Sequence, residues 1–71
     1  MSASLLKQQV EELMGRRDTI KNEIKRAQAE YEKYYTQNLL VEAREAQADI
    51  TRLQQRFNLI EVNLSKLKKY W

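Results

Sequence analysis

Residues 31–46 read YEKYYTQNLLVEAREA and interrupt an otherwise regular helical pattern. Before this stretch, apolar side chains alternate at spacings of four and three residues, the a/d seam of a coiled coil. After it, the same alternation resumes in a different phase. One straight helix would present the two seams on different faces, whereas a chain that folds back brings them together. The sequence therefore predicts an all-α, antiparallel two-helix hairpin over residues 1–71, with helices at about 4–35 and 39–70 and a turn at about 36–38.

The two predicted seams differ in their side chains near the turn, where large residues precede it and small ones follow. The first seam comprises Leu6, Val10, Leu13, Ile20, Ile24, Ala27, Tyr31 and Tyr34, with Arg17 as its polar member. The second comprises Leu39, Ala43, Ala46, Ile50, Leu53, Phe57, Ile60, Leu64, Leu67 and Trp71.

Two antiparallel registers are compatible with these seams. When paired residue numbers sum to 77, Tyr34 faces Ala43 and Arg17 faces Ile60, so a large side chain near the turn meets a small one, as dense packing requires. When they sum to 70, Arg17 faces Leu53 instead and more like charges meet along the flanks. We predict the first register.

The alternative to a hairpin is one long helix with a stutter that forms a coiled coil between molecules. No Pro or Gly marks the proposed turn. Thr36 and Asn38 are the candidate N-cap residues for the second helix.

Composition argues against catalysis. The chain has no Cys or His, which removes the commonest nucleophile, acid/base and metal-ligand groups, and it contains no phosphate-binding or nucleophile motif. Glu42, Glu45 and Asp49 share a helical face, but a solvated face explains them better than a metal site. We expect no enzyme activity, no cofactor and no metal. Without a signal peptide or an apolar run long enough to span a membrane, we expect a cytoplasmic location.

Apolar residues away from the seams indicate a protein partner. A two-helix hairpin has a single interface, so additional outward apolar side chains need a second surface to cover them. We predict a non-catalytic interaction module, such as an adaptor, assembly factor or small chaperone, that either dimerises into a four-helix bundle or packs on another protein. The predicted partner-binding residues are Leu59, Val62, Leu39, Leu40, Tyr70 and Trp71.

Two further roles concern basic residues. Arg17 interrupts the seam, and such a residue can set register or oligomeric state. The alternative function is RNA or DNA binding at the open end of the hairpin, because small hairpins that dimerise into four-helix bundles include an RNA-binding plasmid copy-number family. The nucleic-acid contacts would come from Arg16, Lys66, Lys68 and Lys69, with Tyr70 and Trp71 available for stacking.

Residues 35–53, Tyr-Thr-Gln-Asn followed by an Ala- and Glu-rich helix, resemble the small co-chaperones of secretion-needle subunits. The resemblance covers less than a third of the chain. It implies chaperone activity as one form of the predicted protein binding.

Overall fold

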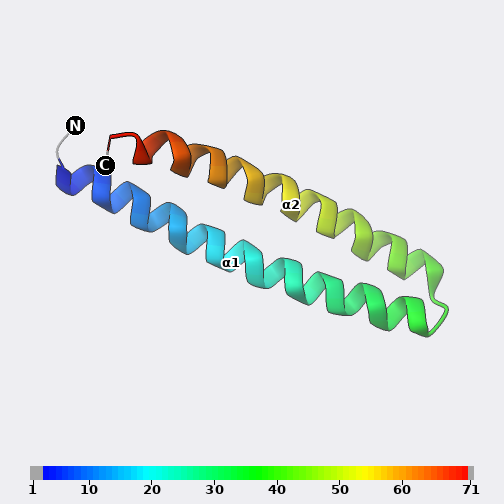
Figure 1. The fold of residues 1–71 in the computed structure, drawn as a ribbon. Helices are drawn as coiled ribbons and strands as arrows, with labels where there is room; N and C mark the ends of the chain where they lie inside the picture. Colours follow the sequence, from blue (N-terminus) through cyan, green and yellow to red (C-terminus); the bar gives the residue numbers. More distant parts are fainter. Residues whose placement is uncertain (1–2, 71) are drawn as a thin grey trace.

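The computed structural model describes residues 3–70 as two α-helices joined by a short turn. The first, α1, spans Ala3–Thr36, and the second, α2, spans Leu40–Lys68. The helices run antiparallel, with the first turn of α1 beside the last turn of α2 (Figure 1). The molecule is 54 Å long, whereas a straight helix of 71 residues would extend about 105 Å. The hairpin is confirmed, and the continuous helix is wrong.

The turn is built on Asn38, which has a φ of 61° and so lies in the left-handed region. The Asn38 N–H donates to the Tyr35 carbonyl at 3.0 Å, and the Leu39 N–H donates to the Tyr34 carbonyl at 2.8 Å. This pair of bonds is a Schellman motif, which satisfies carbonyls left without partners at the end of α1. Glycine usually occupies the left-handed position, but asparagine tolerates it better than most other residues. A hairpin therefore forms here without glycine or proline.

α2 begins within one residue of its predicted start, but the predicted N-cap residues were wrong. The N-cap of α2 is Leu39, which makes no side-chain capping bond, and neither predicted N-cap residue has that role. Asn38 instead ends α1, and the Thr36 hydroxyl donates to the Glu32 carbonyl at 2.6 Å. Leu39 was also expected in the second seam, but it is 41% exposed because the reversal of the chain takes it off the helical face that meets α1.

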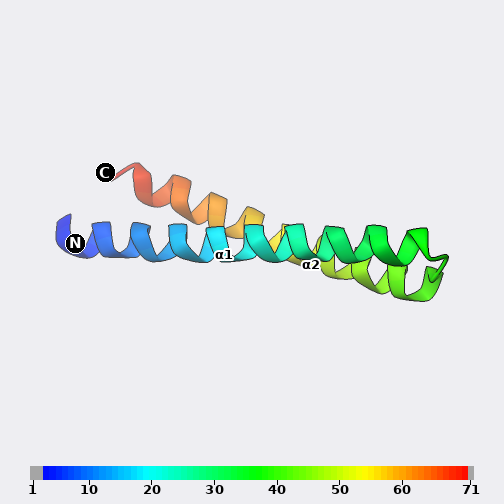
Figure 2. The same cartoon turned by 90° about the horizontal axis from the view of Figure 1, so that it is seen from below.

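The core is the single seam between α1 and α2. Its fully buried members occupy a and d positions: Leu6, Val10, Ile20, Ala27, Ala43, Ala46, Ile50 and Leu64. Every other predicted seam residue between 6 and 67 is half-buried, apart from Leu39, and Trp71 lies outside the described residues. The helices cross at a shallow angle, so that α2 passes from one side of α1 to the other along the rod (Figure 2), as expected of a coiled coil.

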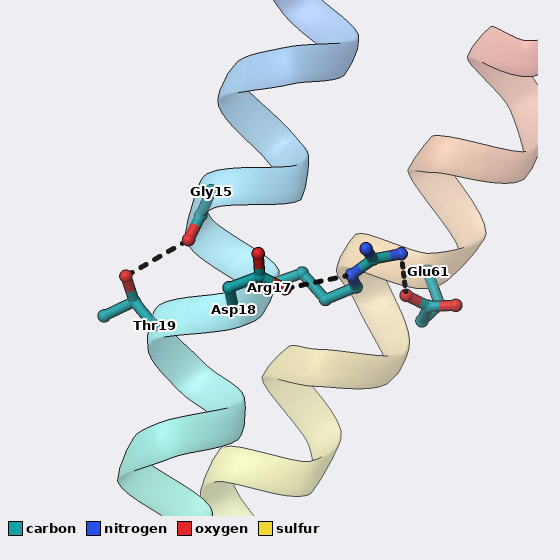
Figure 3. A network of polar contacts seen from close by, with 5 residues as sticks. All are labelled: Gly15, Arg17, Asp18, Thr19 and Glu61. Atoms are coloured by element: carbon teal, nitrogen blue, oxygen red, sulfur yellow. Dashed lines mark hydrogen bonds and ion pairs between the residues drawn. The ribbon is translucent and has the colours of Figure 1, made fainter.

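Arg17 identifies the register. Its Nη1 lies 3.4 Å from Glu61 Oε1 on α2, and its Nε lies 3.7 Å from Asp18 Oδ1 (Figure 3). In the register that sums to 77, Arg17 faces Ile60, the neighbour of Glu61. In the alternative register Arg17 would face Leu53, which lies roughly 12 Å from Glu61 along α2, so the ion pair with Glu61 would not form. The Arg17 side chain is half-buried, so its methylenes cover the seam while the guanidinium stays at the edge.

Replacement of Asn38 tests the turn. Asn38→Val should lower the free energy of unfolding by about 1–2 kcal/mol, because a β-branched residue is strained at positive φ. Asn38→Gly should leave it unchanged or raise it. Urea unfolding followed by far-UV circular dichroism measures both. Asn22→Val, at an exposed position inside α1, is the matched control, and an equal loss at Asn22 and Asn38 would contradict this account of the turn.

Replacement of Arg17 tests its predicted role in oligomeric state. Arg17→Leu makes the apolar seam continuous, so pairing between molecules should become more favourable and the mass in solution should rise. Light scattering at matched concentration measures the mass. Glu61→Gln is the control, since it removes a partly exposed ion pair worth less than about 1 kcal/mol but keeps Arg17 in the seam. A wild-type mass for Arg17→Leu would contradict the prediction.

Candidate protein-interaction surfaces

Large apolar side chains outside the seam remain exposed at several places along the rod. Within residues 3–70 they are Leu5, Met14, Tyr35, Leu39, Leu40, Val41, Leu59, Val62 and Tyr70. The structure does not join the predicted partner-binding residues into one stripe. It places Leu39 and Leu40 at the tip, Leu59 beside a groove between the helices and Tyr70 at the open end, and Val62 is exposed on α2. Trp71 lies outside the described residues.

The tip patch consists of Tyr35, Leu39, Leu40 and Val41, which flank or follow the turn. Tyr35, Leu40 and Val41 are 61, 58 and 68% exposed. Tyr35 also stacks on Tyr31, with ring centroids 5.9 Å apart, so its position is supported by its own helix. Leu39 and Leu40 were predicted as partner-binding residues, whereas Val41 and Tyr35 were not. The apolar run at 39–41 could have identified Val41 as a member of this patch. The seam pattern could not have identified Tyr35, because Tyr35 does not lie at a seam position.

A groove lies between the helices about midway between the turn and the open end. Its apolar lining includes Leu13, Ile20, Leu59 and Ile60. Arg16 and Arg56 stand at its rim, and Leu59, on α2, is 65% exposed. Gly15 lines the same groove, and a Cβ built there would meet no atom within 4 Å. The missing side chain therefore leaves open space above the groove and is not demanded by packing within the hairpin.

The open end carries three of the residues predicted to bind nucleic acid, the lysines of the last turn of α2 and of its C-cap, whereas Arg16 lies beside the groove. Lys66, Lys68 and Lys69 are all exposed. Arg16 is not a free cation, because its Nη2 lies 2.6 Å from Glu12 Oε1. Tyr70 is exposed as well, and Trp71 lies outside the described residues. Three lysines therefore provide most of the accessible positive charge among the predicted contacts.

Folding back separates charge along the rod. Residues 30–50, which form the part of the rod nearest the turn, contain five acidic and two basic side chains, a net charge of −3. The rest of the chain contains eleven basic and five acidic side chains, a net charge of +6. The hairpin thus has an acidic tip region, residues 30–50, whereas the rest of the rod taken together is basic. Splitting the sequence at the turn conceals this, because residues 1–36 and 37–71 carry +1 and +2.

Within residues 3–70, no three carboxylate side chains converge to hold a metal ion, and Glu42, Glu45 and Asp49 form no such group. Neither α1 nor α2 is long and apolar enough to cross a membrane.

Comparison with known proteins adds no family to this description. No protein-family model, curated protein or solved structure matches the chain.

Proposed function

We propose that this hairpin is a non-catalytic protein-interaction module that binds a partner protein, or a second copy of itself, through apolar side chains outside the seam. The observation that supports the proposal is the exposure of Val41, Leu59 and Leu40, at 68, 65 and 58%. The hairpin has one apolar interface, and the seam residues already occupy it. No other part of the described hairpin, residues 3–70, covers these three side chains.

Energetics also favours a partner. Removing a large aliphatic side chain from water contributes about 1.5–3 kcal/mol when burial is complete. Single exposed apolar residues are ordinary on protein surfaces. Here Leu39, Leu40 and Val41 are consecutive and lie close to Tyr35 in the sequence, and a contiguous apolar patch is typical of an interaction site. Adaptors, assembly factors and small chaperones are all compatible with such a surface.

Site-specific photocrosslinking tests protein binding. With benzoylphenylalanine in place of Leu59 or Leu40, illumination of the cells that express the protein should yield a covalent protein adduct, identified by mass spectrometry. The same group in place of Asn22, on the exposed face of α1, should yield at most a tenth as much. Absence of protein adducts from both Leu59 and Leu40 would overturn the proposed function.

RNA or DNA binding is the second candidate, and the segregation of charge favours it. A net charge of +6 lies outside residues 30–50, and Lys66, Lys68 and Lys69 are exposed at the end of α2. Such a surface attracts a phosphate backbone through release of counterions. The exposed ring of Tyr70 is available for stacking on a base.

Salt-dependent binding of a labelled RNA tests this second candidate. If the three lysines contact phosphates, replacing all of them with Gln should reduce the slope of log affinity against log salt by about 2–3. Fluorescence anisotropy over a series of salt concentrations gives the slope. A triple Lys→Gln replacement at residues 7, 21 and 25, on α1, controls for net charge. Passage of the wild-type protein through heparin without retention would remove this candidate.

A further inference from the structure

We infer that the partner for the outer face of α2, the face opposite the seam, is a second copy of this chain, bound antiparallel to the first, with residues 40–50 of each α2 beside residues 51–68 of the other. The inference rests on the proposed function, because it names one partner for the same apolar side chains. Three observations support it: the charge of these two parts of α2, the position of the exposed apolar residues, and the flanking charges.

Charge selects the relative direction of the two copies. Residues 40–50 of α2 contain three acidic and one basic side chain, a net charge of −2, and residues 51–68 contain four basic and one acidic side chain, a net charge of +3. A parallel pair of α2 helices would set each part against a part of the same sign, whereas an antiparallel pair sets unlike parts together. The dipoles of adjacent α2 helices also oppose one another only when the helices are antiparallel. Two-fold symmetry makes the pair closed, so assembly ends at the dimer.

The outer face of α2 supplies a second row of residues spaced alternately by four and three. Its members are Val41, Glu45, Ala48, Arg52, Gln55, Leu59 and Val62. When facing residue numbers sum to 100, Val41 of each copy faces Leu59 of the other, and Ala48 faces Arg52. Val41 and Leu59 are the most exposed large apolar side chains of α2. In the dimer, Val41 of each copy packs against Leu59 of the other, so this contact occurs twice.

Flanking charges agree with this register. It places Glu42 of one copy beside Arg56 of the other, and within residues 3–70 neither side chain is in an ion pair inside the hairpin. Asp49 of both copies approaches the two-fold axis, but Arg52 Nη2 already lies 3.1 Å from Asp49 Oδ1 in each. The axis is therefore surrounded by alternating charges.

Shifting the pairing by one heptad is less favourable in either direction. A sum of 93 sets Val41 opposite Arg52 and brings Glu42 to Asp49 of the other copy. A sum of 107 sets Val41 opposite Lys66. The preferred contact spans residues 41–59, about 27 Å of helix, and buries on the order of 1,000 Å² in total. That area is at the small end for a specific interface, so we expect a reversible dimer.

A charge-reversal cycle tests the contact. Glu42→Arg and Arg56→Glu should each raise the dimer dissociation constant about tenfold, because each lesion occurs twice per dimer. The double variant should return it to within about threefold of wild type. Glu42 and Arg56 lie 14 residues apart on one helix, about 21 Å, so rescue can come only from contact between molecules.

Sedimentation equilibrium measures the dissociation constants, and circular dichroism verifies that each variant is helical. The double reversal Glu11→Arg with Lys25→Glu is the matched control, since it changes the same charges at the same separation on the exposed face of α1. Its dissociation constant should stay within about threefold of wild type. A wild-type protein that is monomeric at about 0.5 mM, or a double variant no better than the single variants, would overturn the inference.

Distances between spin labels determine the direction of the two copies independently. The chain has no cysteine, so Thr51→Cys and Ser65→Cys each introduce one label at an exposed position of α2. In the antiparallel dimer the labels at 51 lie within about 20 Å and those at 65 about 45 Å apart. Short distances at both positions would establish a parallel dimer and overturn the inference. If the crosslinker at Leu59 forms adducts with a different protein and the chain has a monomeric mass, the proposed function holds but the inference that the partner is a second copy is overturned.

Discussion

Burial of one apolar seam between α1 and α2 is the interaction on which the rest of the structure depends. The side chains of residues 6–34 and 43–67 at a and d positions form this interface, and each helix has no other apolar face of comparable length. Because the seam is narrow, both helices must run its whole length to bury enough surface. The helices are consequently long, at 34 and 29 residues, and the molecule is a rod.

The direction of the chain at the end of α1 depends on two backbone hydrogen bonds and one residue with positive φ. Asn38 supplies the left-handed conformation, and the Leu39 N–H then reaches the Tyr34 carbonyl at 2.8 Å. The same reversal removes Leu39 from the seam and starts α2 without a side-chain cap. The apolar residues 39–41 therefore become a tip patch, so the geometry of the turn and the candidate interaction surface have a common origin.

The register of the hairpin determines which polar groups meet. Arg17 lies at a seam position and would be costly there if its guanidinium had no partner. At the edge of the seam it reaches Glu61, 44 residues further along the chain, while its methylenes pack over the interface. An ion pair of this exposure adds little stability. The ion pair instead discriminates between the two registers, because in the alternative alignment Glu61 lies out of reach of Arg17.

The sequence by itself determined the all-helical class, the hairpin and the seam, because heptad spacing and its change of phase depend only on the order of residues. The register was also predictable, since Tyr31 and Tyr34 required small partners, which Ala46 and Ala43 provide. The Schellman turn was not, because Asn38 is equally suited to an N-cap and to positive φ. Only the tertiary structure decided that residues 30–33 and 42–49 share one end of the rod. Charges distant in sequence become neighbours only when the chain reverses, and this is why the acidic tip region, residues 30–50, cannot be seen in either half of the sequence alone.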